Sequence, residues 1–170
     1  MAEVGLLAPQ MRVELIEGEI IDMAPIGMHH TSVVDRLTRW LMSAVSDDAI
    51  VRIQGSFRLS GITEPQPDVI LLKPREDFYW SRFATGEDTL LVIEVSDSTF
   101  RYDREVKAPL YARHGIPEYW IVEIEPARLH LLRSPADGHY TETSIESAPG
   151  VTKLPGLGGK TVDLRRLLTP

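Results

Sequence analysis

The chain has 170 residues, of which 43% are hydrophobic and 25% charged, as in an ordinary globular protein with a buried core. Its formal net charge of −7 argues against a basic protein that coats DNA, although a metal site rich in acids is compatible with this charge. The absence of cysteine excludes disulfides and thiolate–metal sites and fits a reducing cytosol, so we expect a cytoplasmic protein.

The first ten residues contain neither a basic region nor a long apolar stretch, so we expect no signal peptide. No later stretch approaches the length of a transmembrane helix, and no membrane partner is expected. The chain shows no repeats and no low-complexity tract. Residues 1–170 are therefore predicted to form a single domain.

The amino-terminal part of the chain predicts a hairpin, a helix and a strand. Residues 12–24 have the pattern of two short strands with a turn at Glu17 and Gly18. From about 30 to 46, the apolar residues fall on one face of a helix. Residues 50–59 alternate between apolar and polar well enough to predict a strand.

The middle of the chain contains the most apolar segments. Residues 68–72 and 89–95 contain runs that are apolar throughout, as in strands buried on both faces of a sheet. Between them, residues 73–87 are charged and aromatic and should lie at the surface. The Phe-Tyr-Trp cluster at 78–80 has three interpretations: a contact with nucleic acid, a contact with a second subunit, or cover for the sheet.

The carboxyl-terminal part predicts a second helix and further strands. The helix should run over about 103–114 and end at Gly115, and Pro109 inside it predicts a late start or a kink. The predicted strands of this part are 118–124, 128–133 and 139–146. The last two should pair in antiparallel fashion, and residues 162–168 predict at most a short closing helix.

This order of elements predicts an α+β domain with a mixed central sheet flanked by helices and an amino-terminal hairpin. The apolar runs at 69–72, 90–93 and 121–124 should form the middle of the sheet, because both of their faces must be covered.

Two acidic residues stand where apolar strands meet polar sequence. Asp68 precedes one of these runs and Glu94 ends another, and an ionised acid there is costly unless a positive group compensates. Lys107 follows Glu94 by thirteen residues, on the second predicted helix. It shares a helical stripe with Asp103 and Tyr111, so it can point at the acids while its neighbours pack on the sheet.

Two acids and a lysine are sufficient to hold a divalent cation against a phosphodiester and to activate water. Asp68 and Glu94 would anchor Mg²⁺, or alternatively Mn²⁺, and the backbone carbonyl of Val95 would complete the inner ligands. Lys107 would orient the attacking water, help to deprotonate it, or stabilise the charge that develops around phosphorus.

Further residues are candidates for the same site. Glu14 or Glu17 on the hairpin could add a third acid, and Glu14 is the better candidate because Glu17 lies in the turn. His30, at the start of the first helix, and Tyr111 are candidate contacts to the substrate.

The central residues also have purely structural interpretations. Asp68 could be an ordinary acid at the start of a strand, and Glu94 could form a salt bridge with Lys107 or Arg104. Lys107 could instead pair with Asp103 on the helix surface.

Several of these segments have a familiar order: 14–20 (Glu-Leu-Ile-Glu-Gly-Glu-Ile), His30, Pro67-Asp68, 93–99 (Ile-Glu-Val-Ser-Asp-Ser-Thr) and 102–122. Together they resemble the Uma-two family of restriction-endonuclease-like proteins, which belongs to the PD-(D/E)XK nuclease superfamily. The resemblance covers about residues 12–125, and the part from Lys107 to Trp120 is its most specific.

The resemblance implies a restriction-endonuclease-like core, dependence on Mg²⁺, and Asp68 and Glu94 as the metal ligands. It also implies that Lys107 replaces the lysine that usually lies two residues after the second acid, where this chain has Ser96. We therefore expect a metal-dependent endonuclease that hydrolyses DNA phosphodiesters. A homodimer is expected, because cutting both strands requires two sites.

Two other functions remain open. The displaced lysine and the negative total charge fit a catalytically inactive module that uses the same fold to bind nucleic acid or protein. The acidic character also fits a metal-dependent hydrolase of small phosphoesters.

Overall fold

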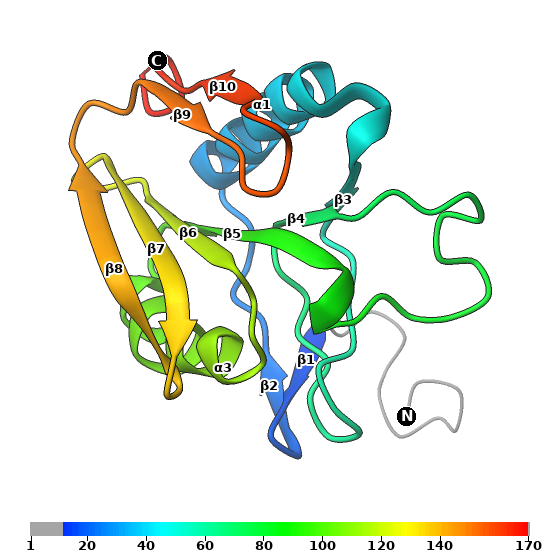
Figure 1. Ribbon diagram of the computed structural model, residues 1–170. Helices are drawn as coiled ribbons and strands as arrows, with labels where there is room; N and C mark the ends of the chain where they lie inside the picture. The colour runs from blue at the N-terminus through cyan, green and yellow to red at the C-terminus, as the bar shows by residue number, and fades with distance from the viewer. Residues whose placement is uncertain (1–11, 170) are drawn as a thin grey trace.

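The computed structural model describes residues 12–169. The expectation about a signal peptide concerns the first ten residues, which lie outside the described residues. A six-stranded sheet forms the centre, with its strands in the order β3-β4-β5-β6-β7-β8. Helix α1 lies on one face of this sheet and α3 on the other (Figure 1). This arrangement confirms the predicted α+β fold. Among residues 12–169, no helix is long and apolar enough to cross a membrane.

The strands are β1 (Val13–Ile16), β2 (Glu19–Asp22), β3 (Ile50–Ile53), β4 (Val69–Leu72), β5 (Thr89–Ser96), β6 (Glu118–Glu123), β7 (Arg128–Ala136), β8 (His139–Glu146), β9 (Val151–Lys153) and β10 (Thr161–Asp163). The α-helices are α1 (Met28–Val45), α2 (Phe100–Tyr102) and α3 (Ala108–Arg113). Short 3₁₀ turns occupy Ser46–Asp48 and Gly86–Asp88. Because β5 is parallel to β6 and antiparallel to β4, the sheet is mixed, as predicted.

The amino-terminal hairpin forms where the sequence predicts it. Glu17 and Gly18 both have positive φ, 50° and 88°, as the tight turn between two antiparallel strands requires. Leu15 and Glu64 exchange backbone hydrogen bonds, which attach the hairpin to the loop before β4. The hairpin is thereby fixed beside the start of β4, and Glu14 is carried with it.

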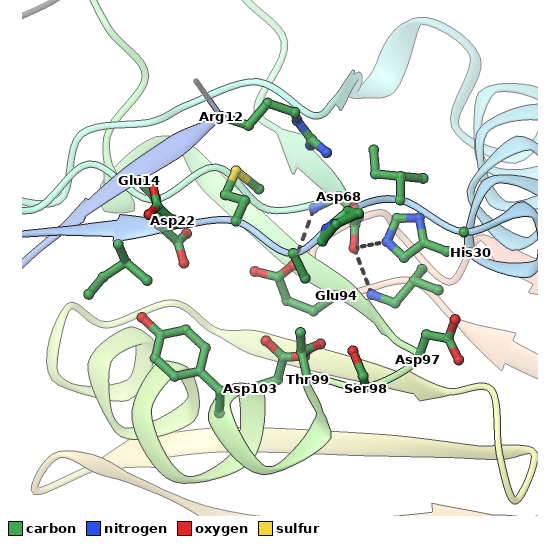
Figure 2. Close-up of a pocket in the computed structure, with 18 of the residues that line it drawn as sticks. Arg12, Glu14, Asp22, His30, Asp68, Glu94, Asp97, Ser98, Thr99 and Asp103 are labelled. Atoms are coloured by element: carbon green, nitrogen blue, oxygen red, sulfur yellow. Dashed lines mark hydrogen bonds and ion pairs between the residues drawn. The ribbon is translucent and has the colours of Figure 1, made fainter. Parts of the chain in front are cut away.

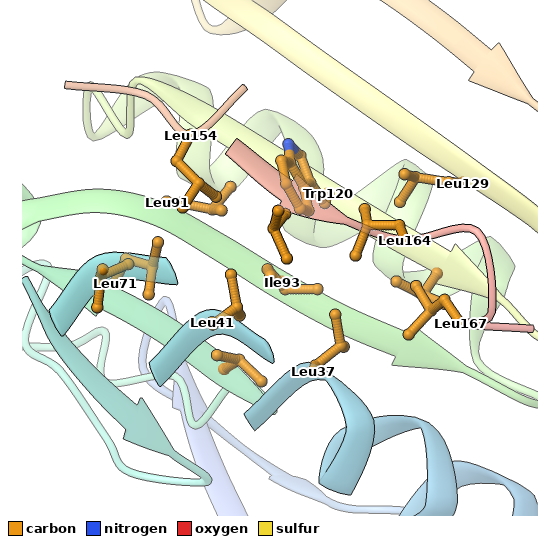
Figure 3. Packing of buried hydrophobic residues seen from close by; sticks show 14 of the residues in the cluster. Leu37, Leu41, Leu71, Leu91, Ile93, Trp120, Leu129, Leu154, Leu164 and Leu167 are labelled. Atoms are coloured by element: carbon orange, nitrogen blue, oxygen red, sulfur yellow. The ribbon is translucent and has the colours of Figure 1, made fainter. Parts of the chain in front are cut away.

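Helix α1 begins at Met28 and buries one apolar stripe against the sheet. Leu37 and Leu41 pack in the same cluster as Leu71 of β4 and Leu91 and Ile93 of β5 (Figure 3). Successive side chains of a strand point to opposite faces, so Val92 and Glu94, which alternate with Leu91 and Ile93 on β5, point away from α1. This alternation places Glu94 on the face that α3 covers.

The second helical segment is continuous from Phe100 to Arg113, but it widens into a π-helical turn over Asp103–Lys107 just before Pro109. Proline has no backbone N–H, and its ring would clash with a carbonyl of the preceding turn, which a wider turn avoids. The predicted kink therefore takes the form of a π-helical turn. Asp103 and Lys107, at its two ends, both have buried side chains.

Two details of the predicted elements were wrong. The strand predicted over 50–59 ends at Ile53, because Gln54 has a positive φ of 46° and donates its N–H to the Asp68 carbonyl. The segment 162–168 forms no helix: it begins within β10, which pairs with β9. Packing decides this outcome, since the segment's apolar side chains join the core beneath α1, namely Val162, Leu164 and Leu167.

Candidate active site

A pocket of about 280 Å³ lies between the amino-terminal hairpin, the start of β4, the end of β5 and the second helical segment (Figure 2). Among the residues that line this pocket, four acids and one lysine are buried, and each of these five is at most 7% exposed. These residues, called the acid–lysine cluster below, are Glu14, Asp68, Glu94, Asp103 and Lys107.

The sheet places Asp68 beside the end of β5. Val69 is the first residue of β4 and pairs with Ile93, so Asp68 lies just beyond the last paired position. Its carboxylate oxygen Oδ2 accepts a hydrogen bond from the Val95 backbone N–H at 2.9 Å. In a strand, the N–H and C=O of one residue point the same way, so the Val95 carbonyl also faces the pocket, which Val95 lines.

Lys107 lies between acids from three separate elements. Its Nζ atom is 2.8 Å from Oε1 of Glu94 and 3.1 Å from Oε2 of Glu14. Asp103, one turn earlier on the helix, has Oδ1 at 4.0 Å from the same nitrogen. The lysine is therefore held by β5, β1 and its own helix together.

Other hydrogen bonds fix the carboxylates behind the pocket. The Tyr111 hydroxyl donates to Oε1 of Glu94 at 3.1 Å. The hydroxyls of Ser96 and Thr99 donate to Oδ2 of Asp103 at 2.6 and 2.7 Å. Ser96 thus holds an acid that in turn faces Lys107.

The cluster contains four carboxyl groups and one lysine, so negative charge is in excess. Burial raises the pKa of Glu94 well above its ordinary value, and Asp103, Asp68 and Glu14 add to the effect against the opposing charge of Lys107. Burial alone would lower the pKa of Lys107, but Glu94, Glu14 and Asp103 raise it above its ordinary value. Lys107 is therefore an ammonium ion at neutral pH.

Two polar atoms in the pocket wall have no partner. His30 places Nε2 at 3.0 Å from Oδ2 of Asp68, whereas its Nδ1 is buried and unpaired. The buried Tyr102 hydroxyl is also unpaired, and burial raises its pKa to about 12. Within residues 12–169, these are the only buried side-chain nitrogen or oxygen atoms without a hydrogen bond. Buried polar groups normally have partners, so the pocket is suited to a polar ligand.

The oxygen atoms of the pocket fit a hard divalent cation. Oδ1 of Asp68 and Oε2 of Glu94 each have only a long contact of 3.4 Å, from Gln54 and from the Asp68 N–H. Oxygen ligands of this kind suit Mg²⁺ and Mn²⁺. In the described part of the chain, no group of three or more His, Asp and Glu side chains could hold an ion. A site here would therefore use two carboxylates and the Val95 carbonyl, which leaves positions for water and phosphate.

Two candidates from the sequence lie outside the pocket. Glu17 is exposed at the hairpin turn and pairs with Arg113 at 2.8 Å, so Glu14 is the hairpin acid of the cluster. Tyr111 is fully buried behind Glu94 and lines no part of the pocket. The structure places its hydroxyl against a candidate metal ligand rather than where a substrate would bind.

Sequence reasoning missed several residues of the pocket wall. Asp103 was considered only as a structural partner of Lys107, and its four-residue spacing from the lysine was the available signal. Arg12, Asp22 and Tyr102 also line the pocket, but no local pattern distinguishes them from surface residues.

Comparisons with known proteins bear on this fold. The model of the Uma2 family, described as "Putative restriction endonuclease", matches residues 3–165. A crystal structure of "a putative nuclease belonging to DUF820" from Anabaena variabilis matches with a TM-score of 0.73. The match has 16% sequence identity and covers 98% of this chain and 95% of that chain, which shows a shared fold. No curated protein matches the chain.

Proposed function

Because the chain belongs to the Uma2 family, described as "Putative restriction endonuclease", we propose that it is a single-domain, metal-dependent endonuclease that hydrolyses DNA phosphodiesters. The observation that carries the proposal is the acid–lysine cluster. Three buried carboxyl groups surround one ammonium ion and a fourth, that of Asp68, lies against His30, so a further cation would offset the excess of negative charge. A divalent cation would do so, and it would also attract the phosphate of a nucleic acid.

Asp68, Glu94 and the Val95 carbonyl would hold Mg²⁺, or alternatively Mn²⁺. The ion supplies a more acidic water and neutralises charge on the phosphate. The Val95 N–H and His30 hold Oδ2 of Asp68, and Tyr111 and Lys107 hold Oε1 of Glu94. In each carboxylate, the other oxygen has only a long hydrogen bond and would be available to hold the cation.

Lys107 orients the attacking water and stabilises the charge that develops around phosphorus. Against the effect of burial, Glu94, Glu14 and Asp103 raise the pKa of Lys107, which favours the charged form of the lysine for this role. The Asp68 carboxylate can only accept a hydrogen bond, so Nε2 of His30 carries the proton of that contact. The other ring nitrogen, Nδ1, is buried and has no hydrogen-bond partner in the described part of the chain.

In this proposal the site is a variant of the PD-(D/E)XK arrangement, in which Lys107 on the helix replaces the lysine lost at Ser96. The two positions, Ser96 on β5 and Lys107 on the helix, lie close in space, because Ser96 binds Asp103 and Asp103 faces Lys107. A homodimer would supply the two sites that cleavage of both strands requires.

Cleavage of supercoiled plasmid tests the proposal. We expect nicked and linear products with Mg²⁺ or Mn²⁺ and none with a chelator. Asp68→Asn should lower the rate by about a hundredfold or more, since it weakens the hold on the cation. Glu17→Gln is the matched control, because Glu17 is an exposed acid of the same hairpin region outside the pocket.

Each other outcome has a definite meaning. Cleavage that persists in Asp68→Asn would assign the activity to a different site or to a contaminant. Competition by mononucleotides as strong as that by oligonucleotides would instead indicate a hydrolase of small phosphoesters. No cleavage with either metal would contradict the proposal.

A further inference from the structure

The segment between β4 and β5 projects beyond the edge of the sheet (Figure 1). It presents Phe78 and Trp80 to solvent at 70% and 94% exposure. This surface is separate from the acid–lysine cluster. The segment joins the end of β4 to the start of β5, whereas the cluster lies at the start of β4 and the end of β5. Exposed aromatic side chains in such a group mark an interaction surface.

The turn that carries these aromatics is firmly built. Phe78 and Tyr79 have φ values of 49° and 64°, a conformation that costs such residues free energy. The Asp77 carboxylate accepts hydrogen bonds from the Tyr79 N–H at 3.1 Å and the Ser81 hydroxyl at 2.6 Å. The Tyr79 hydroxyl donates to the Lys73 carbonyl at 2.8 Å. These contacts hold Trp80 outward on an ordered turn.

A hollow of about 460 Å³ lies beside Trp80, with Tyr79 and Phe83 among its walls. The charged residues that line it are two arginines, Arg52 and Arg82. Arg82 forms a paired contact with Asp88 at 2.6 and 2.8 Å. Among the described residues, Arg52 has no carboxylate within salt-bridge distance. In a chain of net charge −7, this hollow combines aromatic walls with cationic ones.

We propose that this surface, Trp80 with the adjoining hollow, binds single-stranded nucleic acid, with a base stacked on Trp80 and a phosphate paired with Arg52. Indole rings stack on any base, and arginine pairs with phosphate, which together give binding without sequence preference. A duplex hides its base faces, so an outward indole selects unpaired nucleotides. This proposal rests on the proposed function, since it specifies which form of nucleic acid the protein binds.

A second copy of the chain fits this surface less well. A symmetric dimer through the same surface would bring Arg52, whose charge is not paired with a described carboxylate, into the same interface from both copies. Like charges in an interface oppose association, whereas a polyanion is attracted by them.

Fluorescence anisotropy with a labelled strand of about twelve deoxythymidines measures this binding directly. The protein carries Asp68→Asn and the buffer contains a chelator, so nothing is cut. Trp80→Ala should weaken binding about tenfold, and Trp80→Phe should restore most of the affinity. Arg52→Ala should weaken binding and reduce its dependence on salt. Ile145→Ala and Arg128→Ala, an exposed apolar and an exposed basic residue elsewhere, should leave it unchanged.

Equal affinity of Trp80→Ala and its parent for the single strand would overturn the inference. An equal loss for a duplex of the same length would also overturn it, because stacking requires an unpaired base. Sedimentation provides the third outcome: if Trp80→Ala abolishes self-association and leaves oligonucleotide binding unchanged, the surface is a dimer contact. Since binding is measured without metal, these results do not depend on whether the wild-type protein cleaves DNA.

Discussion

The two faces of strand β5 differ in what they bury. On the face toward α1, Leu91 and Ile93 join a layer of mostly aliphatic side chains that also includes Trp120 (Figure 3). On the face toward α3, the alternate positions after Val92 are Glu94 and Ser96, whose side chains are buried and hydrogen-bonded. One strand thus supports an apolar core on one side and buried charge on the other.

The difference separates stability from chemistry. Aliphatic burial is favourable without any directional requirement, so the α1 face can hold the sheet in place. Buried charges are tolerated only when they are paired and hydrogen-bonded, so the other face depends on Lys107 and on the hydroxyls of Tyr111, Ser96 and Thr99. One face is therefore apolar throughout, whereas on the other face the buried charges lie beside a second apolar cluster that includes Val92 and Tyr111.

The largest effect is expected when the charged face loses its lysine. Lys107→Met leaves Glu94, Glu14 and Asp103 without their cation and should lower the free energy of unfolding by about 3–5 kcal/mol. The loss should be greater at about pH 8 than at about pH 6, because the pKa of Glu94 is raised well above its ordinary value and this acid is more fully ionised at the higher pH. Urea denaturation at both pH values measures it, and a variant as stable as the wild type at the higher pH would contradict this account. Plasmid cleavage should also be lost.

The matched change on the apolar face is Leu41→Ala. Leu41 is fully buried against the sheet, and its truncation should lower the free energy of unfolding by about 2–5 kcal/mol. The loss should be the same at both pH values, since no charge is affected. Cleavage by the folded variant should be unchanged. A pH-dependent loss would show that the two faces are not independent.

Adding Mg²⁺ or Mn²⁺ also distinguishes the two faces of β5, with a smaller expected effect on stability. At ten times the dissociation constant, a bound ion stabilises the folded state by about 1.4 kcal/mol, which corresponds to a rise in Tm of about 3–6 °C. Leu41→Ala should show the same rise in Tm on metal addition, although its Tm without metal is lower. Asp68→Asn should lose it, and an equal rise in that variant would place the ion elsewhere.

The smallest effect concerns the pH dependence of Asp103. Burial, opposed by Lys107 and by the hydroxyls of Ser96 and Thr99, raises the pKa of Asp103 above its ordinary value of 3.8. The folded state then binds this proton more tightly than the unfolded state, so its contribution to stability falls as pH rises from 3.8 through the raised pKa. Asp103→Asn should make the decline in unfolding free energy over that range less steep, as measured by denaturation at a series of pH values. A slope equal to that of the wild type would contradict the shift.

Local patterns predicted most of the fold and the central acids. The turn at Glu17 and Gly18, the helical stripe of α1 and the apolar runs of β4 and β5 depend on residues close together in the chain. Asp68 and Glu94 were found because each stands at the polar end of such a run. The segments 50–59 and 162–168 were misread because contacts with distant segments decide their structure.

The sequence by itself determined the order of most elements, the apolar faces of the main helix and strands, and the candidate acids and lysine, because these depend on periodicity and residue type. Only the tertiary structure decided that Glu14 and not Glu17 joins the cluster, that Asp103 faces Lys107 inside it, and that Tyr111 lies behind Glu94. The physical reason is that burial and ion pairing arise where the hairpin, the sheet and the helix meet. That meeting depends on pairings between segments that are far apart in the chain, and no local pattern records them.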